Sequence, residues 1–228
     1  MTNLNVSGIA TTNFWQLGGN NVASGQFLGS TNNQPLELWV NGSRAFRLDP
    51  STNSEGNTPN VIGGSPANND YISGDPVLGT VVGATIAGGG LTNSANTVQS
   101  DFGVVGGGYG NTALGYVSTI AGGVSNQCGT FYYYTFGPTI VIGSFSTIGG
   151  GTYNFDNDDY ATIGGGYDNY ADYTGTVGGG ANNWAEDYAM VGGGYNNVAD
   201  DSFGTIGGGV QNIAYYAGTV GGLSLIHI

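Results

Sequence analysis

Residues Thr162-Ile-Gly-Gly-Gly-Tyr-Asp-Asn-Tyr-Ala171 open a unit that the chain repeats. An aliphatic residue followed by glycines recurs in the same setting, and the copies start at Thr147, Thr162, Thr176, Met190, Thr205 and Thr219. Successive starts are 15, 14, 14, 15 and 14 residues apart. An Asn stands six residues beyond the aliphatic position in the first five of these copies, and an Ala follows two residues later in four of them. A fixed period of this kind indicates a repeat architecture.

Each unit reads as two short strands joined by two turns. The alternation in Tyr160-Ala-Thr-Ile163 predicts a strand with Ile inside and with Thr and the aromatic residue outside. Gly164, Gly165 and Gly166 then supply a turn with positive φ, because glycine has no Cβ to clash there. We expect Asn to close this bend in the left-handed conformation. The positions concerned are Asn169, Asn183, Asn197 and Asn212.

One strand pair per unit predicts an all-β fold, a parallel β-solenoid with rungs of 14 or 15 residues. Weaker copies at Thr85, Val104 and Thr119 extend the repeat domain to residues 80–222. The 28 residues from Thr119 to Thr147 are interpreted as two repeats with a blurred middle. Rungs spaced about 4.8 Å apart would make a rod.

A rung of this size encloses little more than one aliphatic residue and one Ala. Such a thin core offsets little of the chain entropy lost on folding. We therefore expect the outward faces to pack against other copies, and a homotrimer is the natural closed assembly, with a dimer as the alternative.

Composition excludes several classes of function. Of 228 residues 46 are Gly, the chain has no Lys, and its formal net charge is −13. Glycine at this level argues against helices, and two arginines are too few for a nucleic-acid partner. With one His and one Cys the usual general bases and nucleophiles are nearly absent, so we expect no enzyme, no catalytic residues and no cofactor.

The 14-residue period, the small-x-aliphatic-Gly signature and the Asn-x-Ala turn resemble the YadA-type head repeats of trimeric autotransporter adhesins. The resemblance covers about 140 residues of the repeat region. It implies a left-handed β-roll assembled as a homotrimer on a bacterial surface, extracellular, binding a host or cell-surface protein or glycan. The chain departs from that family by carrying Thr-Ile-Gly-Gly-Gly, and neither a coiled-coil stalk nor a membrane anchor is seen in it.

Residues 1–79 have a different texture and form a separate N-terminal region. Asn3–Gly8, Phe14–Leu17 and Phe27–Leu36 resemble segments of phage tail fibres and large bacterial surface proteins, so a tail-fibre part is the alternative function. Asn41-Gly42 between two apolar runs predicts a β-hairpin that caps or joins the solenoid.

The two arginines of the chain lie on the second strand of this expected hairpin. Because Arg44 and Arg47 are three residues apart, they should lie on opposite faces and pair with Glu37, Asp49 or Glu55. The stretch from Asp49 to Pro76 reads as a linker or loop.

The candidate ligand face is an outward ladder of hydroxyls and rings. Its members are Thr147, Thr162, Thr176, Thr205, Tyr160, Tyr188 and Phe203. Such a face suits a glycan, a fibrous protein or ice, and the competing interpretation is the trimer interface. The clustered carboxylates of Asp156-Asn-Asp-Asp159 could suit calcium, and the competing interpretation is a solvated turn. The solvated turn is preferred, so no metal is expected. Cys128 is interpreted as an inert small residue.

The last six residues, 223–228, break the repeat. Leu-Ser-Leu-Ile-His-Ile is what the end sequence of a transposon used in library preparation encodes. We expect these residues to be a sequencing-adapter artefact, with a short apolar terminal strand as the alternative. No hydrophobic run in the chain approaches the length of a membrane span.

Overall fold

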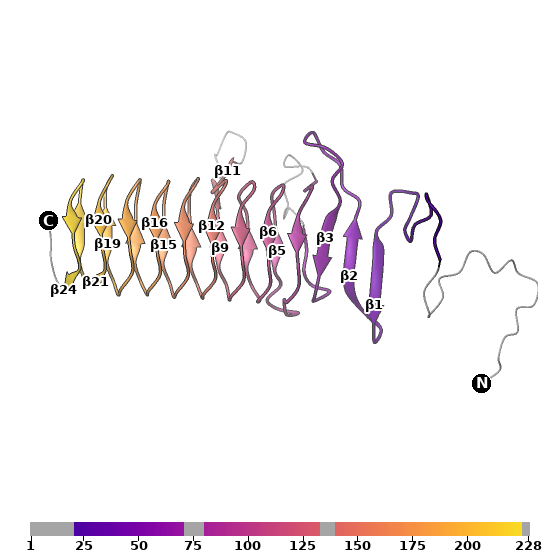
Figure 1. Cartoon of the computed structure of the whole chain (residues 1–228), viewed down its shortest axis with the longest axis horizontal. Helices are drawn as coiled ribbons and strands as arrows, with labels where there is room; N and C mark the ends of the chain where they lie inside the picture. Colours follow the sequence, from indigo (N-terminus) through magenta and orange to yellow (C-terminus); the bar gives the residue numbers. More distant parts are fainter. Residues whose placement is uncertain (1–20, 71–79, 133–139, 225–228) are drawn as a thin grey trace, which may run out of the picture.

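The computed structural model describes residues 21–70, 80–132 and 140–224, and in these ranges it is all-β with no helix. Two-stranded coils stack in parallel into a β-solenoid of about eight turns, which confirms the predicted fold class (Figure 1). Asn3–Gly8 and Phe14–Leu17 lie outside the described residues.

One wall of the solenoid is a twelve-stranded sheet, here called the Thr sheet. It runs in the order β1 (Leu36–Val40), β2 (Ser43–Asp49), β3 (Asn60–Gly63), β4 (Thr85–Ile86), β6 (Val104–Val105), β8 (Thr119–Ile120), β12 (Thr147–Ile148), β14 (Thr162–Ile163), β16 (Thr176–Val177), β18 (Met190–Val191), β20 (Thr205–Ile206) and β23 (Thr219–Val220). From β3 onward each strand pairs in parallel with the strand of the next coil.

The opposite wall is an eight-stranded parallel sheet, here called the Ala sheet. It contains β5 (Thr97–Val98), β7 (Thr112–Ala113), β9 (Gln127–Cys128), β13 (Phe155–Asp156), β15 (Tyr170–Ala171), β17 (Trp184–Ala185), β19 (Val198–Asp200) and β22 (Ile213–Tyr215). Two small pairs remain, which are β10 (Thr130–Tyr132) with β11 (Ile140–Ile142) and β21 (Gly209–Val210) with β24 (Leu223–Ser224).

The core is as thin as the sequence predicts. In the coil of β14 and β15, Ile163 from the Thr sheet and Ala171 from the Ala sheet are fully buried, with Ala161 at the turn between coils. Aliphatic residues stack on aliphatic residues along the Thr sheet, and alanines stack on alanines from Ala171 to Ala214 on the Ala sheet. Each coil therefore buries its apolar side chains mainly against the coils before and after it.

The strands are shorter than predicted. Only Thr162 and Ile163 form β14, while Tyr160 lies in the preceding turn with φ of 61°. The expectation that the aromatic residue alternates with Thr on one strand was wrong, because a residue with left-handed backbone cannot continue the extended conformation.

Asn does not close the glycine turn with left-handed backbone, which corrects a second expectation. In this turn the left-handed residue is the one before Asn, such as Asp168 with φ of 52° or Asn182 with φ of 54°. Asn169 and Asn183 are themselves buried. Of the glycines, Gly165 and Gly166 have positive φ, and a Cβ on Gly166 would collide with the carbonyl oxygen of Gly180 in the next coil.

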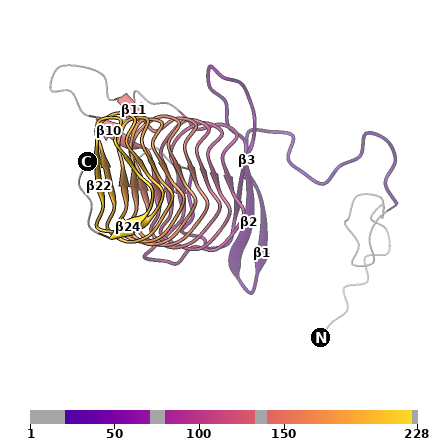
Figure 2. The ribbon, with the colours of Figure 1, turned by 60° about the vertical axis from the view of Figure 1, so that its left-hand side comes forward.

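The 28 residues from Thr119 to Thr147 form one coil and an inserted hairpin, where two repeats were expected. Thr147 pairs directly with Thr119, and Phe155 pairs directly with Gln127, so no coil lies between them. The extra residues form the antiparallel pair β10 and β11, which leaves the rod at one edge (Figures 1 and 2). A chain excursion of this kind preserves the stacking because it begins and ends at the same turn.

The N-terminal hairpin extends the Thr sheet beyond the first coil. β1 and β2 pair antiparallel, β2 pairs antiparallel with β3, and β3 pairs in parallel with β4 (Figure 1). The hairpin thus joins the solenoid as predicted. β3 lies inside the stretch that was interpreted as a linker or loop, and its buried Ile62 stacks on Ile86. Pro76 lies outside the described residues.

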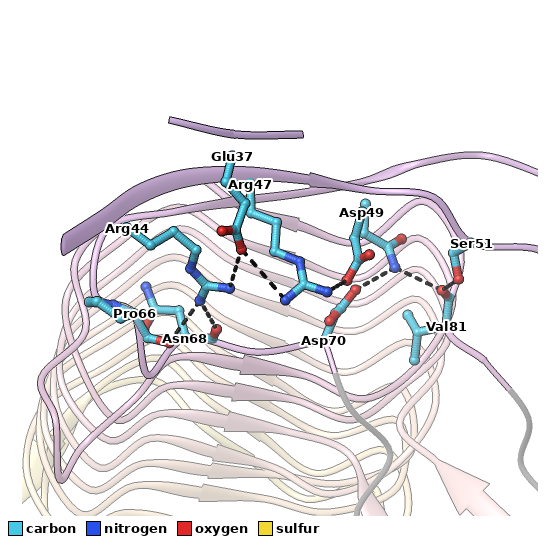
Figure 3. Close-up of polar contacts among 10 residues, drawn as sticks. Glu37, Arg44, Arg47, Asp49, Ser51, Pro66, Asn68, Asp70 and Val81 are labelled. Carbon is cyan, nitrogen blue, oxygen red and sulfur yellow. Dashed lines mark hydrogen bonds and ion pairs between the residues drawn. The ribbon is translucent and has the colours of Figure 1, made fainter. Parts of the chain in front are cut away.

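Arg44 and Arg47 lie on one face of the hairpin, not on opposite faces. β2 has an extra residue at Ala45, because Leu38 pairs with Phe46 while Trp39 pairs with Arg44. Such a bulge shifts the alternation of side chains by one residue. Both guanidinium groups consequently approach Glu37, with N to O distances of 3.8 Å for Arg44 and 4.0 Å for Arg47 (Figure 3).

These arginines tie the hairpin to the first coils, and the predicted pairing with Glu37 and Asp49 is confirmed. Arg44 Nη2 donates to the backbone oxygens of Pro66 at 2.7 Å and Asn68 at 3.1 Å, and Arg47 forms an ion pair with Asp49 (Figure 3). Burial raises the pKa of Asp49 despite its arginine neighbour. The cations therefore serve the junction between hairpin and solenoid.

Among the described residues no helix is long and apolar enough to cross a membrane. Of the final segment, Leu223 and Ser224 form β24 beside β21, and residues 225–228 lie outside the described residues.

Candidate functional site

The predicted Thr ladder forms a column on the outer surface of the Thr sheet. Thr147, Thr162 and Thr176 stand in direct register on successive coils. Met190 interrupts the column, and Thr205 and Thr219 continue it. Thr147 and Thr162 are exposed, while Thr176 and Thr205 are half-buried. Because parallel strands lie about 4.8 Å apart, the column offers one hydroxyl at each such step.

Bare backbone flanks the Thr column on one side. Gly164 lies two residues beyond Thr162 and is exposed, and a Cβ on it would collide with the carbonyl oxygen of Gly178. Equivalent glycines at the same position make this strip of the Thr sheet flat, and they are Gly149, Gly164, Gly178, Gly192 and Gly207.

The predicted aromatic residues flank the Thr column on the other side, at the turns that lead from the Ala sheet back to the Thr sheet. We call these turns, at residues 157–161, 172–175, 186–189 and 201–204, the acidic edge. Tyr160, Tyr188 and Phe203 are about half exposed here, at 55%, 49% and 58%. Rings of neighbouring coils stack, as Phe145 does on Tyr160 and Tyr188 on Phe203. The structure thus brings the Thr and aromatic candidates together as adjacent columns, although not on one strand.

The carboxylates of the acidic edge are of two kinds. Some cap the turns, as when Asp159 Oδ1 accepts hydrogen bonds from the backbone N–H groups of Gly143 at 3.0 Å and Ser144 at 2.7 Å. Asp187 and Asp201 are exposed to solvent. Partial burial raises the pKa of Asp158 and Glu186, and neighbouring carboxylates raise both further.

A second aromatic surface lies on the Ala sheet and was not among the predicted candidates. Phe155, Tyr170 and Trp184 occupy the outward position of successive strands, with ring centroids 5.6 Å and 4.4 Å apart. Trp184 is 42% exposed. The signal was available in the sequence, since each of these rings directly precedes the inward Ala or Asp of the Asn-x-Ala pattern.

The turn asparagines form a buried ladder that holds the coils together. Asn183 Nδ2 donates to Asn169 Oδ1 at 3.1 Å and to the glycine oxygens of Gly179 at 3.0 Å and Gly194 at 3.1 Å. Its Oδ1 accepts from the backbone N–H and from Nδ2 of Asn197. The same pattern recurs from Asn111 to Asn197. These asparagines are therefore structural, as predicted, but their role is to join coils and not to bend the chain.

Asp156 occupies the position that Ala holds in other coils and is fully buried, so interpreting Asp156–Asp159 as a wholly solvated turn was wrong for its first residue. Its two carboxyl oxygens are buried, and the side chain of Ser146 favours the charged form only in part. Burial is the largest cause and raises the pKa of Asp156 well above its ordinary value. It stacks on Cys128, whose buried thiol also has a raised pKa, from burial first and then from Asp156.

No group of three or more His, Cys, Asp or Glu residues suited to a metal ion occurs in the described ranges 21–70, 80–132 and 140–224. The described surface presents rings, hydroxyls and carboxylates that recur along the rod.

Comparison of the chain with protein-family models and with curated proteins finds no match.

Proposed function

We propose that the chain is a non-enzymatic attachment protein, a fragment of an extracellular adhesin that presents a repeated surface to cells, matrix proteins or glycans. The observation that carries the proposal is the pair of adjacent outward columns of Thr and aromatic residues, which recur on most coils. A repeated surface binds a repeated ligand through many weak contacts, and multivalency raises the overall affinity.

The buried features support the same proposal. The ionisable and amide groups inside the rod either hydrogen-bond from coil to coil or stay neutral, and these serve the fold. The groups left free to contact a ligand are therefore those of the outward Thr and aromatic columns.

The proposed assembly is a homotrimer. Its support is the thin core together with the exposed ring of Trp184 and its neighbour Tyr170 on the Ala sheet, which a single rod leaves in water. Light scattering with a cross-linking series should give three subunits, and a stable, well-folded monomer would remove the trimer from the proposal.

The attachment function is tested by coating beads with the full chain and measuring their retention on cells, collagen-type matrix and immobilised glycans. Parent beads should be retained, and beads carrying the double variant Thr162→Val, Tyr160→Asn should be retained less. Retention equal to that of uncoated beads on every surface would contradict the proposal.

Ice or crystalline carbohydrate is a second candidate ligand, favoured by the flat strip of Thr and bare glycine backbone on the Thr sheet. It requires this strip to be exposed in the assembled protein. Thermal hysteresis measured on the monomeric or oligomeric protein tests it, and ordinary freezing behaviour would exclude ice.

A further inference from the structure

A column of aromatic rings follows the acidic edge. Phe145 and Tyr160 stack with ring centroids 5.2 Å apart and an interplanar angle of 8°, and Tyr188 and Phe203 stack at 5.2 Å and 18°. Tyr173 adds an edge-on contact to Tyr188 at 5.2 Å. These rings cover one another only in part, and Phe145, Tyr160, Tyr188 and Phe203 remain about half exposed.

Rings of this column stand at left-handed backbone positions. Tyr160, Tyr188 and Phe203 have φ of 61°, 55° and 69°. Bulky residues are uncommon in this conformation. The turns at the opposite edge, which lead from the Thr sheet to the Ala sheet and are here called the glycine edge, have a left-handed position too. Asp168, Asn182 and Asn196 fill it in three successive coils, and Tyr153 fills it in the coil before them. Asn is thus a residue that the chain itself uses at such positions, which makes it a suitable replacement for the rings.

The charge beside the rings determines what can cover them. Asp187 directly precedes Tyr188, and Asp201 lies two residues before Phe203. Both carboxylates are exposed. The sequence has no Lys, and both arginines are committed to the N-terminal hairpin. Packing this edge against the same edge of another copy would bring carboxylates together without a compensating cation, so a second copy of the chain is a poor occupant.

We propose that the acidic edge binds a cationic polypeptide segment, with Arg or Lys side chains lying over the exposed rings and their charges beside the carboxylates. The proposal rests on the attachment function proposed above and names the partner class for one of its surfaces. Rings attract a cation through their quadrupole, and a guanidinium also stacks on them. The repeat of the rod sets the spacing between successive binding positions, since rings and carboxylates recur together on neighbouring coils.

The test measures binding of poly-L-arginine to the full chain by calorimetry at two salt concentrations. The ring variant Tyr188→Asn, Phe203→Asn removes two rings and suits the left-handed backbone, so it should fold. The charge variant is Asp187→Asn, Asp201→Asn. The matched control is Tyr153→Asn, Tyr167→Asn, which removes a ring pair, 6.0 Å apart, from the glycine edge. Circular dichroism and melting temperature verify each fold.

We expect the ring variant to bind about tenfold more weakly, because it lacks the cation–π contacts. The charge variant should bind more weakly with a shallower salt dependence, and the control should match the parent protein. Equal binding by the ring variant and the parent would overturn the proposal, as would equal losses in the ring variant and the control, because the attraction would then be general to the rod's negative charge.

The two proposals fail separately. Bead retention without poly-L-arginine binding overturns the cationic partner and leaves the attachment function in place. Ring-dependent poly-L-arginine binding without bead retention supports the site and contradicts the attachment function.

Discussion

At the scale of single residues, the informative positions are those that depart from the repeat. Asp156 stands where Ala171, Ala185 and Ala199 stand in other coils, and it is buried with a raised pKa. Its thiol neighbour Cys128 replaces another Ala. Two neighbouring coils thus carry a carboxyl and a thiol inside an otherwise apolar stack, and the pH dependence of stability should arise there.

Replacing Asp156 with Ala should stabilise the protein at neutral pH and change its pH dependence. In the unfolded chain this carboxyl ionises near its ordinary pKa of about 4, whereas the folded protein keeps it protonated to much higher pH. Between these values unfolding releases a proton, so the free energy of unfolding falls as pH rises. Asp156→Ala should remove this fall.

Melting temperatures measured from pH 4 to pH 8 test the Asp156 prediction. The parent should lose stability toward pH 8 more steeply than Asp156→Ala. Asp187→Ala, at an exposed carboxylate, is the control and should keep the slope of the parent. Parallel curves for the parent and Asp156→Ala would contradict the assignment of a buried neutral carboxyl.

Replacing Asn183 with Ala should lower the free energy of unfolding by about 3 kcal/mol or more. Each buried donor or acceptor that loses its hydrogen bond costs about 1–3 kcal/mol. The affected acceptors include the oxygens of Gly179 and Gly194, and the N–H of Asn197 loses its acceptor. Urea unfolding followed by circular dichroism gives the difference. Asn182→Gly, at the neighbouring left-handed position, should stay within about 1 kcal/mol of the parent. A similar effect of both changes would argue against the ladder.

At the scale of elements, the sequence predicts what recurs and misses what is inserted. The period predicts β14 and β15 and their stacking, because each coil repeats one buried aliphatic residue and one buried Ala. It fails at β10 and β11, since an insertion of nearly one period mimics a degraded repeat. The face of Arg44 was also missed, because the bulge at Ala45 depends on which residues pair across the hairpin and leaves no local signature.

Deleting residues 130–142 should leave the solenoid intact. The deletion shortens the 28-residue interval between Thr119 and Thr147 by 13 residues to 15, which is one repeat length. Gly129 and Gly143, which would be joined, already lie close together. The variant should keep its β-sheet circular dichroism and melt within a few degrees of the parent. A control that deletes seven residues, 155–161, removes half a coil and should unfold the rod, whereas unfolding in both deletions would contradict the inserted hairpin.

At the scale of the whole molecule, the rod carries its negative charge on turns while its only cations lie at one end. The candidate columns follow from the same regularity, so sequence reasoning found Thr162 and Tyr160. It could not place them on separate columns, because φ at Tyr160 is set by how one coil passes into the next.

Added salt should therefore stabilise the rod. Carboxylates on coils about 4.8 Å apart repel one another, and raising the ionic strength from about 0.01 M to about 1 M shortens the Debye length from about 30 Å to about 3 Å. The ion pairs of Arg44 and Arg47 with Glu37 weaken in salt, but they are partly exposed and contribute little by comparison. We expect the melting temperature to rise by several degrees. Asp187→Asn, Asp201→Asn should raise the melting temperature at low salt and reduce the increase, and a melting temperature that falls with salt would show that attraction, not repulsion, dominates the charges of the rod.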